Sequence, residues 1–347
     1  MLSKCLFDPP NEICLRKLSS HQILINTSKI KLFNNYACHV DVIFKKVQTR
    51  SFLSQRPTSE PIPEIKLQHQ PNTDNLETEI ANHIQPYFQL QTPCVFKDLN
   101  SKSDAFFCWK SLDYLRMAVG EDTPCHVEFG GPYNATSKEK NGNNLLQISF
   151  GDYIDYMTLF QQQKNNDKSD HTYDAVTETQ NIHKNEESSP LLYLAQNDLF
   201  PGLMNDFSIP EFCQDHSYNV GNDGRLYSTM IWFGPKGVTS PLHHDPLDNL
   251  LMQFVGTKRI LLFPPTVDGN DNYYYSGPVH GQQTNTSAIP SHMIDKNMVS
   301  SEFSMFRNAP PALECLLNPG DVLYIPSKWW HYVKSIDTSL SVNVWFR

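Results

Sequence analysis

The sequence predicts a mainly β fold with flanking α-helices, and three observations lead to it. Beyond Leu191, short runs rich in β-branched and aromatic residues are separated by Gly, Pro and Asn signals. No helix-length segment lies between neighbouring runs, as a parallel βαβ sheet would need. Helical stripes dominate the chain before these runs. We therefore expect a small barrel or jelly roll with helices packed on it.

Three helices are predicted in the first half of the chain. Apolar residues at i, i+4 and i+8 cover 76–84, and this helix should end at Pro86, which lacks an amide and clashes with the preceding turn. The second helix lies between a Ser111 N-cap and Gly120, a typical C-terminal stop. The third follows Ser149, which forms a capping pair with the carboxylate three residues later.

The second half contains the predicted strands. Five runs have the composition of strands: 226–233, 249–255, 258–263, 321–325 and 339–346. The second and third runs are joined by Gly256-Thr257, which predicts a β-hairpin. Residues 266–312 are rich in Ser, Asn and Pro and predict one long loop. Loops of this length often act as lids.

The domain boundaries follow from composition. Residues 57–71 are rich in Pro, Glu and Gln, which is typical of a linker. We therefore expect residues 1–70 to be a basic, poorly ordered N-terminal extension and linker, and 71–347 to be the folded domain. Residues 161–190 carry almost no apolar side chains and cannot offset the entropy of ordering. They predict a disordered insertion within the domain.

The composition is that of a globular chain in a reducing compartment. The chain has 347 residues, 39% of them hydrophobic, and no apolar run approaches the roughly 18 residues that cross a bilayer. No membrane partner is expected. The eight cysteines form no CxxC pair, which disfavours a zinc cluster or a secreted disulfide framework. We expect a nuclear or cytoplasmic protein.

Charge is distributed unevenly along the chain. Residues 1–56 hold nine basic residues against three acidic ones, a net charge of +6, which leaves −15 for residues 57–347. An acidic body repels polyanions, so nucleic acid is not expected as a partner. The basic start has the composition of a mitochondrial targeting segment, except for Asp8 and Glu12. The alternatives are mitochondrial localisation and an N-terminal extension that carries no targeting signal.

The sharpest chemical signal is the run from Ser240 to Asp245, which contains His243 and Asp245 two residues apart. Residues i and i+2 of a strand point the same way, so an imidazole and a carboxylate can meet at one point while His244 faces elsewhere. His331, 88 residues after His243, would complete a facial site that leaves part of an Fe(II) ion open. The alternatives are a polar strand end and a core histidine packed between aromatic residues.

Five motifs occur in order along the chain: TPCVFKDL (92–99), CHVEFGGPY (125–133), YLAQNDLF (193–200), WFGPKGVTSPLHHDPLDNLLMQFVGTKRILLFPP (232–265) and LNPGDVLYIPSKWWHYVKSIDTSLSVNVWF (317–346). In these motifs the sequence resembles the Jumonji-C branch of Fe(II)- and 2-oxoglutarate-dependent oxygenases. It is most similar to the short subgroup with arginyl-hydroxylase and lysine-demethylase-like members. The resemblance covers about residues 75–347.

The resemblance implies a double-stranded β-helix, the cupin-like jelly roll, with an Fe(II) site made by His243, Asp245 and His331 and with O2 as the oxidant. It also implies contacts to the cosubstrate 2-oxoglutarate from Tyr193, Ser240, Asn249, Lys258, Asn343 and Trp345. Lys258 would pair with the distal carboxylate, because charge-assisted hydrogen bonds are strong. Without the motif, Lys258 would be interpreted as a solvated turn lysine.

The reaction implied by the resemblance is hydroxylation of a protein side chain, or N-demethylation through hydroxylation of an N-methyl group. The implied substrate contacts are Glu128, Tyr133, Gln196 and Trp232. With the acidic body they predict a basic target, Arg or Lys. For Glu128 a structural ion pair is the alternative. A tRNA-modifying hydroxylase, which needs a basic groove, and a non-catalytic cupin-like binding protein are the alternative functions.

Overall fold

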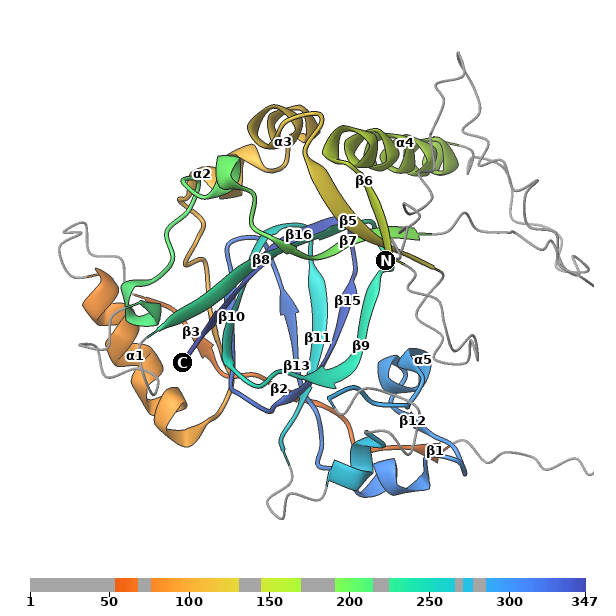
Figure 1. Ribbon diagram of the computed structural model, residues 1–347. Helices are drawn as coiled ribbons and strands as arrows, with labels where there is room; N and C mark the ends of the chain where they lie inside the picture. The colour runs from red at the N-terminus through yellow and green to blue at the C-terminus, as the bar shows by residue number, and fades with distance from the viewer. Residues whose placement is uncertain are drawn as a thin grey trace, which may run out of the picture. The chain divides into compact units, whose positions relative to one another are not determined.

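In the computed structural model, two β-sheets face each other and form the jelly roll that the sequence predicts (Figure 1). The structure describes residues 54–67, 76–130, 145–169, 191–214, 225–265, 271–276 and 285–347, all within the unit Ser51–Arg347. In these ranges one sheet has nine strands and the other has five. The extension predicted before residue 54 lies outside the described residues.

All five predicted runs are strands. In spatial order, the larger sheet consists of β3 (Glu64–Ile65), β4 (Cys94–Phe96), β14 (Val322–Ile325), β10 (Asp248–Val255), β16 (Ser339–Phe346), β8 (Leu226–Gly234), β7 (Leu191–Asp198), β5 (Pro124–Gly130) and β6 (Leu145–Ser149). The smaller sheet consists of β2 (Glu60–Pro61), β13 (Leu313–Leu317), β11 (Lys258–Phe263), β15 (Trp330–Ser335) and β9 (Thr239–His244). Neighbouring strands are antiparallel apart from the parallel pairs made by β2 and β3.

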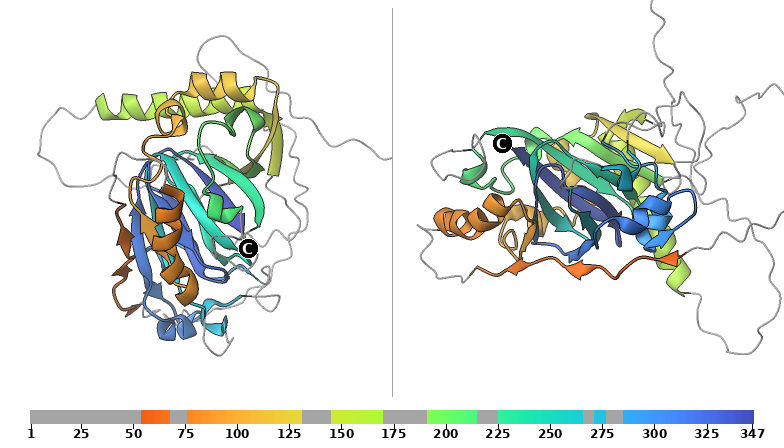
Figure 2. Two further views of the ribbon diagram at one scale, coloured as in Figure 1. Left: turned by 90° about the vertical axis from the view of Figure 1, so that its left-hand side faces the viewer. Right: turned by 90° about the horizontal axis from the view of Figure 1, so that it is seen from below.

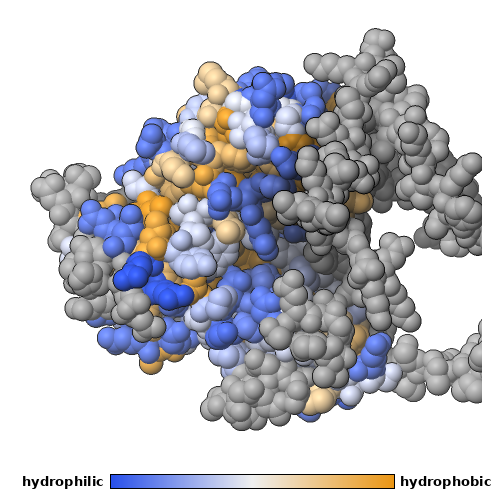
Figure 3. All heavy atoms as spheres, in the orientation of Figure 1, coloured by the Kyte–Doolittle hydropathy of each residue, from blue (hydrophilic) through white to orange (hydrophobic). Residues whose placement is uncertain are grey.

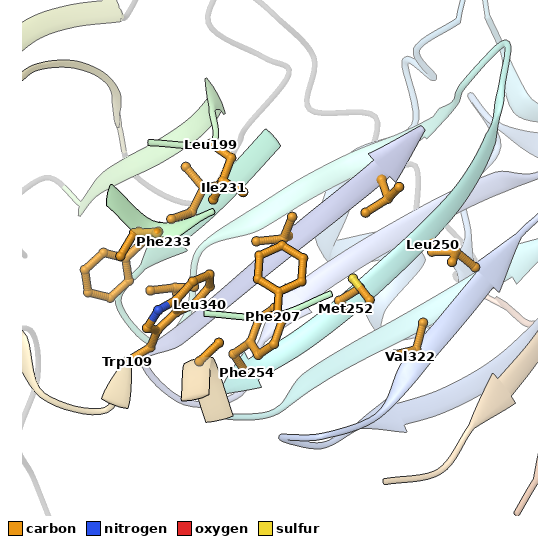
Figure 4. Close-up of a cluster of buried hydrophobic side chains, with 14 of the residues drawn as sticks. Trp109, Leu199, Phe207, Ile231, Phe233, Leu250, Met252, Phe254, Val322 and Leu340 are labelled. Atoms are coloured by element: carbon orange, nitrogen blue, oxygen red, sulfur yellow. The ribbon is translucent and has the colours of Figure 1, made fainter. Parts of the chain in front are cut away.

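Period-two alternation separates the interior of the barrel from its outer faces. Along β15, His331 and Val333 face inward, whereas Trp330 and Tyr332 join an outer cluster. Apolar residues from both sheets meet in the interior: Leu251, Ile260, Leu262, Leu323, Ile325 and Val333. The outer face of the larger sheet packs against the helices, and Figure 4 shows part of that cluster around Trp109 and Phe254.

The predicted hairpin between the second and third runs is wrong. β10 pairs with β14 and β16 in the larger sheet, whereas β11 pairs with β13 and β15 in the smaller one. Gly256 therefore turns the chain from one sheet to the other, with φ of 67°. A Cβ there would lie 2.0 Å from the carbonyl oxygen of Thr338, so the corner requires glycine.

The helices lie outside the sheets: α1 (Leu76–Leu90), α2 (Asp104–Cys108), α3 (Leu112–Val119), α4 (Phe150–Ser169) and α5 (Ser291–Asp295). Ser111 caps α3 as predicted, and Ser149 makes its capping pair before α4. However, α1 continues past Pro86, because Phe88 stacks on Tyr324 at 5.3 Å and holds the last turn on the core.

The insertion predicted for 161–190 begins too early, since α4 continues through Ser169. Residues 170–190 lie outside the described ranges. Residues 266–312 are also not one loop. Where described, they form η5 (Asp271–Tyr274), α5, β12 (Met298–Val299) and η7 (Ser304–Asn308), which pack on the outer face of the smaller sheet. These elements are too short for sequence periodicity to detect.

Residues 54–67 belong to the folded domain, so the boundary predicted at residue 71 is wrong. β1 (Ser54–Gln55) pairs with β12, β2 pairs with the smaller sheet and β3 with the larger one. We call residues 54–67 the strap; Figure 2 shows it running along one side of the barrel. Arg56 anchors it, because its buried guanidinium lies 4.0 Å from the ring centroid of Phe306 and donates to the Ala309 and Pro310 carbonyls.

The surface of the molecule is mixed in character. On the face shown in Figure 3, hydrophobic residues reach the surface in separate places among hydrophilic ones. No helix in the described ranges is both long enough and apolar enough to cross a bilayer. The cysteines at described positions, Cys94, Cys108, Cys125, Cys213 and Cys315, are all free thiols.

Candidate functional site

His243, Asp245 and His331 lie together at one end of the smaller sheet. β9 and β15 are antiparallel neighbours, and their register places His243 directly opposite His331. The two imidazole centroids are 4.1 Å apart, and Asp245 follows the end of β9. One ligand atom from each of the three side chains lies within 4.8 Å of the others. The structure thus brings together all three residues predicted to bind iron.

The hydrogen bonds of the two histidines suit metal binding. Nδ1 of His243 lies 2.7 Å from the Pro241 carbonyl oxygen, and Nδ1 of His331 lies 3.0 Å from that of Trp329. A carbonyl can only accept, so each Nδ1 carries the proton and each Nε2 keeps a lone pair. Two such nitrogens and one carboxylate are the donor set of a facial Fe(II) site. The residues present therefore fit the ion.

Burial keeps the His331 ring neutral. Its side chain is buried, and desolvation together with the neighbouring His243 lowers the pKa of His331 to about 4. His244 faces the other side of β9, where its ring packs against Trp330 at 4.7 Å. The neutral ring can accept a metal, and the alternation expected for these histidines is the one observed.

A cavity of about 310 Å³ between the two sheets contains this cluster. Ten of the thirteen predicted site residues line it: Tyr193, Gln196, Trp232, Ser240, His243, Asp245, Lys258, His331, Asn343 and Trp345. Asn249 and Glu128 do not line the cavity, and Tyr133 lies outside the described residues. Most of the predicted site residues therefore converge on one cavity.

Lys258 is a buried cation without a carboxylate partner among the described residues. It is 2% exposed, and Nζ donates to the Ser341 hydroxyl at 2.6 Å. Burial lowers the pKa of Lys258 to about 7. An isolated buried charge is costly, so an anion entering the cavity would relieve this cost. The solvated turn lysine considered from sequence is wrong.

Two β-bulges bring further polar groups into the cavity. The β9–β15 register shifts between Ser240 and His243, which turns both side chains inward although simple alternation would separate them. A second shift in β7 lets Gln196 line the cavity with φ of 53°. The Tyr193 and Ser240 hydroxyls lie close enough to interact, and both side chains line the cavity. They form a hydroxyl pair on the cavity wall.

The two predicted asparagines lie on neighbouring strands. Asn343 of β16 lines the cavity. Asn249 of β10 is completely buried, and neither its amide nitrogen nor its amide oxygen has a partner among the described residues. It lies opposite Trp345 and two positions before Leu251, which lines the cavity. A buried amide without partners at this position is a candidate ligand contact.

Glu128 lies next to the cavity on β5. It is directly opposite Tyr193 of β7, so the two side chains share one face of the sheet. Burial raises the pKa of Glu128, and no described Lys or Arg pairs with it, which argues against a structural ion pair. Trp232 lies 5.8 Å from Tyr193 between ring centroids. A carboxylate and an aromatic pair therefore flank the cavity.

Sequence reasoning missed several residues that line the cavity or contact a lining residue. Ser341 was not singled out, yet it lies two positions before Asn343 on the same face of β16. Ser228 and Met230 precede Trp232 by the same period of two. Extending the alternation outward from the predicted positions would have found all three. Asn285 also lines the cavity, although it is distant from His244 in sequence. It exchanges hydrogen bonds with the His244 backbone, and no local sequence pattern indicates this contact.

Comparison with known proteins gives a consistent result. The family described as "Cupin-like domain" matches residues 81–347. The chain is 31% identical over 272 residues to "Lysine-specific demethylase JMJ30" of Arabidopsis thaliana, covering 77% of this chain and 52% of that protein. It is 30% identical over 295 residues to "Lysine-specific demethylase 8" of Danio rerio, covering 84% and 60%.

A third relative, "JmjC domain-containing protein D" of Dictyostelium discoideum, is 33% identical over 261 residues, which are 72% of this chain and 50% of that protein. The chain thus spans about half the length of these curated relatives, and somewhat more of the Danio rerio protein.

Proposed function

This chain belongs to the cupin-like JmjC family, and from that premise we propose that it is an Fe(II)- and 2-oxoglutarate-dependent oxygenase acting on a basic side chain of a protein. The observation that carries the proposal is one cavity holding both a facial His-Asp-His cluster and a buried lysine without an anionic partner among the described residues. A metal cluster alone would suit many reactions. The added cation specifies an anionic cosubstrate.

Iron held by His243, Asp245 and His331 would supply oxidising chemistry, in which O2 and 2-oxoglutarate become succinate and CO2 while one oxygen atom enters the substrate C–H bond. Lys258 binds the distal carboxylate of 2-oxoglutarate, and the Tyr193 and Ser240 hydroxyls orient it. Asn249 and Asn343 donate toward the end of the cosubstrate near the metal. Trp345 walls the cosubstrate. The low-dielectric interior strengthens each of these contacts by excluding water.

The substrate in this proposal is cationic. Glu128 supports this because its half-buried carboxylate has no cationic partner among the described residues and lies opposite Tyr193, which lines the cavity. A guanidinium or ammonium group would satisfy the carboxylate and stack on the Trp232 indole, while the Gln196 amide completes the contact. Arginine fits this arrangement best, because its planar guanidinium both stacks and forms paired hydrogen bonds.

The reaction can end in hydroxylation or in demethylation. Oxygen insertion into a C–H bond of the side chain leaves an alcohol, whereas insertion into an N-methyl group gives an unstable hemiaminal that releases formaldehyde. The relatives named lysine-specific demethylases support the second outcome for a methylated lysine. Mass spectrometry of arginine, lysine and methyl-lysine peptides distinguishes hydroxylation from demethylation. Hydroxylation adds one oxygen atom, about 16 Da, whereas demethylation removes a methyl group.

The first test measures succinate formed from 2-oxoglutarate by the purified chain with Fe(II), O2 and a peptide library. His243→Ala should abolish turnover, because it removes one metal ligand. His244→Ala is the matched control, since His244 packs on Trp330 away from the cluster, and it should retain most turnover. Equal loss in both folded variants would reject the ligand assignment.

The second test concerns the substrate. Glu128→Gln keeps the size of the side chain and removes its charge, so turnover on arginine or lysine peptides should fall at least tenfold, roughly the 1–3 kcal/mol of a desolvated charge pair. Asparagine- and histidine-centred peptides serve as neutral targets. A preference for these, or full activity of Glu128→Gln on basic peptides, would reject the cationic substrate.

A further inference from the structure

Trp345 makes a hydrogen bond that links the two sheets at the candidate metal site. Its indole Nε1 donates to Oδ2 of Asp245 over 3.1 Å, and the same oxygen lies 3.7 Å from Nε2 of His331. Trp345 belongs to β16 of the larger sheet, whereas Asp245 follows β9 of the smaller one. The bond therefore reaches across the barrel to a carboxylate of the cluster.

The backbone of β16 aims the indole at this carboxylate. Trp345 lies two positions after Asn343 on β16, and the period of two along the strand turns both side chains toward the cavity. Trp345 is half-buried and lines the cavity. Its donor group thus lies at a defined place in the site and is not free to turn toward solvent.

Each of the three candidate ligands has one hydrogen bond that orients its side chain, and for Asp245 this is the bond from Trp345. Each imidazole is oriented through its own Nδ1 by a carbonyl group two residues earlier. The Asp245 backbone oxygen accepts from the Lys328 amide at 2.8 Å, which fixes the main chain but leaves the side-chain torsions open. In the described part of the chain, Trp345 is the one hydrogen-bond donor to the carboxylate.

We propose that Trp345 is a positioning residue that orients the Asp245 carboxylate toward His243 and His331 and thereby sets the metal affinity of the site. This role goes beyond walling the cosubstrate, because it acts before any cosubstrate binds. It rests on the proposed function in one respect, namely that the cluster binds a metal. Hydrogen-bond partners of metal ligands typically contribute 10- to 100-fold to metal affinity.

The chain offers a matched control for the test. Trp232 lines the same cavity, but its indole Nε1 is buried without a hydrogen-bond partner among the described residues. Trp345→Phe and Trp232→Phe therefore make the same chemical change, and only the first removes a bond to a ligand. Co(II) affinity is measured by calorimetry and visible absorption without 2-oxoglutarate, and circular dichroism verifies the fold of each variant.

We expect Trp345→Phe to weaken Co(II) binding about tenfold or more, with an altered absorption spectrum, and Trp232→Phe to match wild type. In an Asp245→Ala background, Trp345→Phe should cause no further loss, because the indole acts only through the carboxylate. Wild-type affinity in Trp345→Phe, or an equal loss without Asp245, would overturn the role. Failure of the wild type to bind Co(II) would instead overturn the metal site and the proposed function with it.

Discussion

Lys258 shows how a single residue can be held ready for a ligand. The side chain lies inside the barrel, where the described residues give it the Ser341 hydroxyl but no carboxylate. Desolvation therefore acts without compensation, and the pKa of Lys258 falls to about 7. In the free protein near neutral pH the group is partly uncharged. A dianionic ligand would favour the charged form and raise the pKa again.

We therefore predict that 2-oxoglutarate binding takes up protons at pH 8. Above about pH 7 the free lysine is mainly neutral and must be protonated to pair with the carboxylate, so affinity should fall as pH rises through this range. Calorimetry in two buffers of different ionisation enthalpy measures the uptake. Lys258→Ala should abolish it and weaken 2-oxoglutarate binding strongly, while Co(II) binding stays nearly unchanged. If Lys258→Ala weakened Co(II) binding but left the affinity for 2-oxoglutarate unchanged, the assignment of Lys258 as the carboxylate contact would be wrong.

The same shift makes a statement about stability. Between about pH 7 and the usual lysine pKa near 10.5, the unfolded chain binds more protons at this residue than the folded one. The contribution of Lys258 to folding stability without ligand therefore improves as pH rises through that window. Binding of the anion removes the effect, because the lysine is then charged in both states.

At the scale of elements, the corner between β10 and β11 decides how the barrel closes. The residues Gly256-Thr257 look like a hairpin turn in sequence, yet the flanking strands belong to opposite sheets. The chain can cross there because Gly256 adopts φ of 67° and passes close to the Thr338 carbonyl. Lys258 begins the strand that follows, so the corner also places the proposed cosubstrate clamp.

Gly256→Ala should destabilise the domain by about 3–4 kcal/mol, since it combines the left-handed backbone with a steric clash. Gly237→Ala is the control: φ there is 94°, but the nearest atom to a new Cβ is 4.0 Å away. Only the backbone cost of about 1–2 kcal/mol should appear at Gly237. Urea unfolding measures both. Equal losses at the two sites would show that the close approach to Thr338 contributes nothing.

At the scale of the whole molecule, the strap connects β12, the smaller sheet and the larger sheet, which do not pair with one another through other described strands. Within residues 54–67, successive two-residue strands pair with β12, the smaller sheet and the larger sheet. Its anchor, Arg56, is 6% exposed and stacks on Phe306 and Phe263. Desolvation lowers the pKa of Arg56 to about 10, but the guanidinium stays charged at neutral pH.

Arg56→Ala should therefore lower the free energy of unfolding by about 2–4 kcal/mol, because it removes charged hydrogen bonds to two carbonyls and the aromatic stacking. Lys66→Ala is the control, since Lys66 is a basic but exposed residue of the same strap and should change stability by less than about 0.5 kcal/mol. Chemical unfolding measures the free energy of unfolding of both variants. A neutral effect of Arg56→Ala would mean that the strap adds no stability to the barrel.

Local spacing in the sequence predicted the His243–Asp245 pair of the site, whereas the family resemblance supplied the cosubstrate and substrate contacts. His243 and Asp245 share a face through the period of two, and His244 is turned away by the same rule. The strand runs were recognisable because they alternate or are continuously apolar. Ser240 could not be placed this way, since a bulge between it and His243 reverses its side. The resemblance supplied it instead.

The sequence by itself thus determined the class of fold, five of the strands, two of the helix caps and the His243–Asp245 pair, all of which depend on neighbours in the chain. Only the tertiary structure decided which strands pair, that Gly256 turns between sheets, that the strap belongs to the domain, and that Lys258 is buried without an anion among the described residues. Pairing and burial depend on contacts between residues far apart in sequence, and local pattern carries no record of these contacts.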